Sequence, residues 1–136
     1  MITDITVKVR ADIEKEAYGV MENVKDYVDT EPGKYFHVIF SAVFPKDFDG
    51  KLRVEISHPK NGFKTYHIVN NPPKEVLAQI EEGDALCFGS PGIPISKLLG
   101  WTYRPVMGQI DYVNVKLFLD NHEIVNKDFP VRGTFS

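Results

Sequence analysis

Turn residues divide this sequence into short segments, and that division constrains the fold more than any other feature. A Pro-Gly pair stands at 32–33, a proline and a glycine bound 45–50, and an Asn-Gly pair stands at 61–62. Several of the intervening segments alternate apolar and polar residues, as a strand with one buried face does. Short strands with a turn signal about every eight to twelve residues predict a β-sandwich.

The alternation predicts strands along most of the chain. They are residues 2–9, 35–44, 51–57, 63–70 and the two arms of 111–131. Segment 35–44, YFHVIFSAVF, is apolar on both faces, which predicts a central strand covered on both sides. The Asn-Gly pair predicts that 51–57 and 63–69 form a hairpin. A second hairpin is predicted at 111–131, where Pro130 suits an edge strand or a bulge.

Three segments do not alternate in this way. Residues 11–28 have apolar residues at spacings of three and four, so we predict an amphipathic helix despite Gly19. The alternative is a pair of short edge strands. The sequence KEVLAQIEEGD, residues 74–84, predicts a short helix with Val76, Leu77 and Ile80 facing the core. Segment 85–108 is apolar but interrupted by glycine and proline, so we predict a long connection with brief strands near 85–88 and 101–107.

Length and charge narrow the class of protein. The 136 residues are the size of one domain, and 43% of them are hydrophobic and 26% charged, as in ordinary globular proteins. The net charge of −3 and the absence of a Lys/Arg cluster argue against nucleic-acid binding. No signal sequence and no apolar run of membrane-spanning length is present, so we expect a cytoplasmic protein that does not bind a membrane.

Two segments carry a resemblance to a known group of proteins. The sequences DGKLRVEISHPKNG and DYVNVKLFLDNHEIVNKDFPV resemble the central and final hairpins of small immunoglobulin-like sandwiches from bacteria, many of unknown function. The likeness covers roughly residues 35–70 and 108–132. The cysteine pair of antibody domains is missing, and Trp101 falls in the irregular connection. The resemblance implies an immunoglobulin-like antiparallel β-sandwich with one or two short helices, and it implies no activity.

The irregular connection contains the residues that we expect to make an interface. Large apolar side chains gather there, and aromatic residues on loops often form binding hot spots. The candidates are Phe88, Ile95, Leu98, Trp101 and Tyr103. Packing against the sandwich is the structural alternative for the same residues. A third interpretation is that they line a pocket for a small apolar ligand under residues 85–107.

Catalytic and metal-binding patterns are weak. His58 and His67, with Asp47 or Asp49 from the nearby turn, are the candidate metal ligands, although their spacing matches no known motif. The single cysteine, Cys87, lies between Leu86 and Phe88, so we predict a buried and inert thiol. Ser90, in Gly-Ser-Pro-Gly, is predicted to lie in a turn.

These observations favour a non-enzymatic function. We expect a protein-interaction module or small accessory protein that binds another protein or a second copy of itself. The alternative is a binding protein for a small apolar ligand, and a metal- or cysteine-dependent hydrolase is the third class. We predict no catalytic residues and no cofactor.

Overall fold

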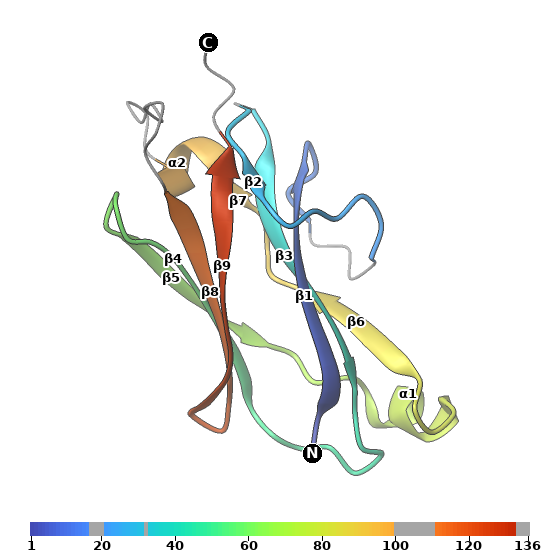
Figure 1. The fold of residues 1–136 in the computed structure, drawn as a ribbon. Helices are drawn as coiled ribbons and strands as arrows, with labels where there is room; N and C mark the ends of the chain where they lie inside the picture. Colours follow the sequence, from blue (N-terminus) through green and yellow to red (C-terminus); the bar gives the residue numbers. More distant parts are fainter. Residues whose placement is uncertain (17–20, 32, 100–110, 133–136) are drawn as a thin grey trace.

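The chain forms two facing β-sheets with two short helices (Figure 1). This computed structural model describes residues 1–16, 21–31, 33–99 and 111–132. Sheet A contains β1 (Thr3–Asp12), β3 (Tyr35–Val43), β6 (Ala85–Gly89) and β7 (Ile93–Pro94). Sheet B contains β2 (Val28–Asp29), β9 (His122–Arg132), β8 (Tyr112–Leu119), β4 (Leu52–His58) and β5 (Phe63–Val69), in that order. The prediction of a mainly β protein is therefore confirmed.

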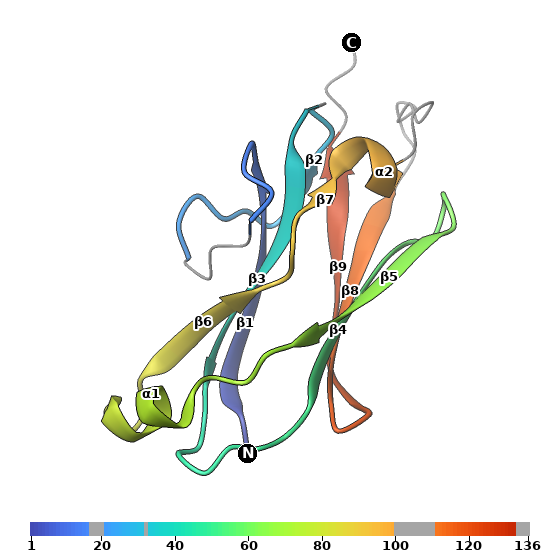
Figure 2. The same ribbon diagram turned by 180° about the vertical axis from the view of Figure 1, so that it is seen from behind.

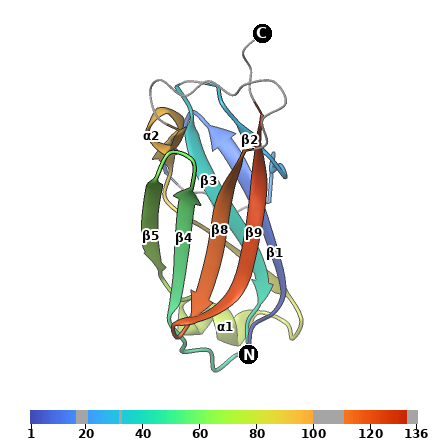
Figure 3. The same cartoon turned by 60° about the vertical axis from the view of Figure 1, so that its left-hand side comes forward.

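The two sheets face one another, with sheet B curled into a half-barrel (Figure 3). Side chains alternate along each strand, so every second residue reaches the space between the sheets. The fully buried core includes Phe36, Val38 and Phe40 from β3, Val54 and Ile56 from β4, Val113, Val115 and Leu117 from β8, and Phe129 from β9. Burial of these side chains is the main source of stability in such a fold.

Strand β3 lies at the centre of sheet A, between β1 on one side and β6 and β7 on the other. Its outer face is covered as well, because His37 and Ile39 are fully buried there. The Nε2 of His37 donates a hydrogen bond to the carbonyl oxygen of Glu14 at 2.8 Å. The prediction of a central strand covered on both faces is confirmed.

The helix predicted over 11–28 is wrong for the residues that the structure describes. Strand β1 continues to Asp12, which pairs with Tyr35 of β3. Further along, the backbone of Lys25 pairs with Val9 through two hydrogen bonds of 2.7 and 3.0 Å. In the described part of this segment, pairing with other strands takes the place of helical hydrogen bonds at Asp12, Lys25 and Val28, so the helical spacing of apolar residues is not used there.

Both predicted hairpins are present. Strands β4 and β5 pair without a bulge from Leu52↔Val69 to His58↔Phe63. Strands β8 and β9 are joined by the two residues Asp120 and Asn121, whose φ angles are 49° and 68°. Positive φ at both positions is the geometry of the tight turn that matches the twist of a hairpin.

The chain crosses from β5 in sheet B to β6 in sheet A through α1 (Lys74–Gln79), as Figure 2 shows. The predicted short helix is thus confirmed, although Val76 is 38% exposed while Leu77 is buried. Strand β6 confirms the brief strand near 85–88. Helix α2 (Ile95–Leu99) was not predicted, and the strand expected at 101–107 lies outside the described residues. Within those residues, no helix is long and apolar enough to cross a membrane.

Candidate functional site

Three of the predicted interface residues pack into the protein. Ile95 and Leu98 of α2 are 2% and 0% exposed. Phe88 stacks on Phe40, with ring centroids 5.0 Å apart, and meets Phe44 edge to face at 5.7 Å. These three side chains therefore pack against the sandwich, which was the alternative to an interface, and present little surface to a partner. Trp101 and Tyr103 lie outside the described residues.

The candidate metal ligands are not brought together. His58 is at the end of β4, whereas Asp47 and Asp49 precede the start of that strand. Six residues of strand separate those ends by about 20 Å. His67 lies opposite Val54, in the middle of the hairpin. Among the residues that the structure describes, no three His, Cys, Asp or Glu side chains are placed to hold a metal ion.

The prediction that Cys87 is buried is wrong. Its neighbours Leu86 and Phe88 pack against the core, so the alternation of β6 turns Cys87 outward, and the thiol is exposed.

Ser90 is also more than a turn residue. It is 1% exposed, its amide donates to the carbonyl of Val38 at 2.9 Å, and its Oγ accepts from the amide of Val38 at 3.0 Å. It extends the pairing with β3 past the end of β6.

The histidine at the end of β4 forms a buried pair that the sequence did not indicate. The Nε2 of His58 donates to Oδ2 of Asp111 at 2.9 Å, and His58 is fully buried. The other carboxylate oxygen of Asp111 accepts from the amide of Tyr112 at 2.8 Å, while the Asp111 carbonyl accepts from the amide of Val131 at 3.1 Å. The pair therefore ties together the ends of β4, β8 and β9.

Strand β5 forms one edge of sheet B. In the part of the chain that the structure describes, it pairs with β4 alone, and all seven of its residues stay in register. Its outward side chains are Lys64, Tyr66 and Ile68, and the latter two are 67% and 58% exposed. We call these three residues the β5 edge face. A long, regular strand edge with exposed apolar residues is open to pairing with another strand.

A small cavity of about 120 Å³ lies between β5 and the segment that joins β6 to β7. It is lined by Ile56, Thr65, Tyr66, His67, Ser90, Pro91, Gly92 and Ile93. Partial burial there lowers the pKa of His67, so the ring is neutral near pH 7. The cavity is smaller than the 300–1,000 Å³ or so of typical ligand pockets, and is closer to the size of one side chain.

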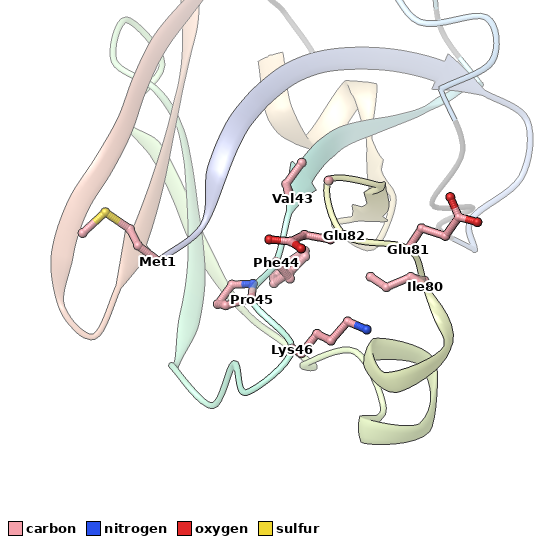
Figure 4. Close-up of a pocket in the computed structure, with 9 residues that line it drawn as sticks. Met1, Val43, Phe44, Pro45, Lys46, Ile80, Glu81 and Glu82 are labelled. Carbon is pink, nitrogen blue, oxygen red and sulfur yellow. The ribbon is translucent and has the colours of Figure 1, made fainter.

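A larger pocket of about 410 Å³ lies at the other end of the molecule, between the end of β3 and the loop after α1 (Figure 4). Phe44 and Ile80 give it an apolar floor, and Lys46, Glu81 and Glu82 place charges around it. It is not the predicted pocket under 85–107, because none of its lining residues comes from that segment. Its mixed lining does not single out one ligand.

No protein-family model and no curated protein matches this chain.

Proposed function

We propose that this chain is a non-enzymatic protein-interaction module that binds an extended segment of a partner protein along β5. The proposal rests on the β5 edge face. Its two apolar side chains are exposed, and no described residue pairs with the outer side of β5. Main-chain hydrogen bonds from an added strand provide affinity, and alternate side chains provide specificity. The regular register of β5 supports the proposal, since natural edges that avoid such pairing are usually bulged or short.

The β5 edge face also indicates the chemistry of the partner. Tyr66 and Ile68 favour apolar residues at two alternate positions of the added strand, and Lys64 favours a carboxylate at the third. Thr65 and His67 point toward the cavity of about 120 Å³, which has room for one small side chain of the partner. We expect a partner segment with apolar residues at every second position and an acidic residue near one end.

The immunoglobulin-like arrangement of the two sheets is a further part of this proposal. The antiparallel order β9-β8-β4-β5, facing a second sheet across a shared core, supports it. An experimental structure compared strand by strand with immunoglobulin domains tests it.

The experiment replaces both apolar residues of the β5 edge face, as Tyr66→Lys with Ile68→Lys. The matched control carries Val76→Lys with Ile124→Lys, two residues that are 38% and 37% exposed elsewhere. Each protein is used for affinity capture from the source cell. Removal of a buried tyrosine anchor costs about 2 kcal/mol or more, roughly thirtyfold in affinity.

We expect the wild type and the control to capture the same protein and the edge variant to lose it. Hydrogen exchange on the captured complex should slow at the amides of residues 64–68. Capture that survives the edge substitutions, or protection at another surface, would contradict strand addition at β5. Sedimentation at several concentrations shows whether the added strand comes from a second copy of the chain.

A further inference from the structure

The outer face of sheet B carries a groove that the proposed interaction does not use. Because β4, β8 and β9 are adjacent, their outward side chains form rows across the sheet. One row contains Ser57, Asn114 and Asp128, and the next contains Glu55, Lys116 and Asn126. The groove has a volume of about 360 Å³ and is lined by these strands. Its edge nearest to β5 is Ser57 of β4, which lies beside Lys64.

Hydrogen bonds hold the polar side chains of the groove in place. The amide nitrogen of Asn114 donates to Oδ1 of Asn126 and to Oδ1 of Asp128, each at 2.7 Å. Both amide hydrogens of Asn114 are thereby committed. The arrangement leaves the amide nitrogen of Asn126 as a donor, and the second carboxylate oxygen of Asp128 as an acceptor, at the groove surface.

The groove offers no unmatched positive charge among its described lining residues. Lys116 lies beside Glu55 of β4 and is 3.8 Å from the carboxylate of Glu123, so its positive charge is already matched, and Asp128 adds a negative charge to the groove. Such a surface matches a neutral ligand with many hydroxyl groups, each of which both donates and accepts hydrogen bonds. A phosphorylated or sulfated ligand would place its charge next to Asp128.

One end of the groove is apolar and rigid. Tyr112, which is 39% exposed, and Pro59 line this end. The buried bond between His58 and Asp111 joins the residues immediately beside them, so their positions are fixed from below. An aromatic ring at the end of a polar groove can stack on the C–H face of a sugar while its neighbours bind the hydroxyl groups.

We propose that this groove binds a neutral oligosaccharide. Strand spacing is about 4.8 Å and residue spacing about 3.3 Å, so three strands and the stretch from Tyr112 to Lys116 span about 10 by 13 Å. A pyranose ring is about as wide as one strand spacing. The groove therefore accepts two or three sugar rings, one of them against Tyr112.

The test uses NMR spectra of the ¹⁵N-labelled protein titrated with cellohexaose, maltohexaose, xylohexaose and chitohexaose. We expect saturable shifts at the amides of Tyr112, Asn114, Asn126 and Asp128 with at least one of these probes. Asp128→Ala removes hydrogen bonds to a charged group and should weaken that binding at least about tenfold. Tyr112→Ala should weaken it as well, while Tyr112→Phe should retain it.

The matched control is Ile124→Ala, which changes another exposed residue of β9 and should leave the affinity unchanged. The absence of shifts in the groove with every probe at about 10 mM would overturn the proposal, since that excludes even weak specific binding. Equal affinity of Asp128→Ala and wild type would also overturn it. A heparin hexasaccharide that binds more tightly than all four neutral probes would show that the groove selects charge and not hydroxyl groups. Variants of the β5 edge face should bind the oligosaccharide normally, so either proposal can fail without the other.

Discussion

Ser90→Ala provides a sharp test of how the centre of sheet A is held together. Strand β6 ends at Gly89 and β7 begins at Ile93, so β3 loses its strand partner between them. Ser90 fills this gap, because its backbone and hydroxyl bond both the carbonyl and the amide of Val38. The substitution removes the hydroxyl and leaves the buried amide of Val38 without its acceptor.

The expected cost follows from that geometry. A buried donor deprived of its acceptor costs about 1–3 kcal/mol, because it has lost water and gains nothing in exchange. Alanine also leaves a void smaller than a methyl group, which adds little. For a chain of this size, the loss corresponds to a decrease in Tm of roughly 3–15 °C.

Urea unfolding followed by circular dichroism measures the change, and hydrogen exchange at the Val38 amide locates it. We expect the variant to be less stable and the Val38 amide to exchange faster than its neighbours in β3. Ser41→Ala, at a half-buried serine of the same strand, serves as the control. A stability loss below about 0.5 kcal/mol with unchanged exchange at Val38 would refute the reasoning.

Three other substitutions test separate parts of the structure. Gly92→Ala should cost about 1–3 kcal/mol in urea unfolding, since the added methyl would lie 2.7 Å from the carbonyl oxygen of Lys15; wild-type stability would contradict this packing. Burial lowers the pKa of His67, so stability should fall as the pH drops through about 6.5, where the unfolded chain takes up the proton first, and His67→Gln should reduce that slope. The hydrogen bond from Lys8 lowers the pKa of Asp26 below 3.8, so the stabilisation is present above that pH and lost below it. Asp26→Asn should therefore be less stable than wild type at pH 7 and equal to it once the carboxyl is protonated; a constant difference in a pH series would contradict the ion pair.

Local patterns were sufficient to predict the two hairpins. Strand alternation and the turn residues at 61–62 and 120–121 act between neighbours in sequence, so they remain visible without the fold. The prediction for Cys87 was wrong because apolar neighbours in the sequence were taken as its surroundings. In a strand those neighbours point to the opposite face, and the same alternation would have placed the thiol outside.

Contacts between distant residues could not be predicted in the same way. The segment 11–28 has the spacing of a helix, and the structure of its described residues depends on pairing with β3 and on the pairing of Lys25 with Val9. The partners His58 and Asp111 are 53 residues apart in the sequence. Only the order of the strands in sheet B brings them together. The groove on that sheet depends on the same order, and no single segment of the sequence contains it.

The position of the final hairpin has a consequence for how the chain is made. Strand β8 pairs with β4, and β9 follows β8 in the sheet, so the middle of sheet B is complete only after both strands have been synthesised. A nascent chain that ends before β8 leaves one side of β4 unpaired and exposes Leu52, Val54 and Ile56 to water. Long-range pairing of this kind delays the folding of sheet B until β8 and β9 have been made. Chaperones that recognise apolar strands have their opportunity in the interval before β8 and β9 are made.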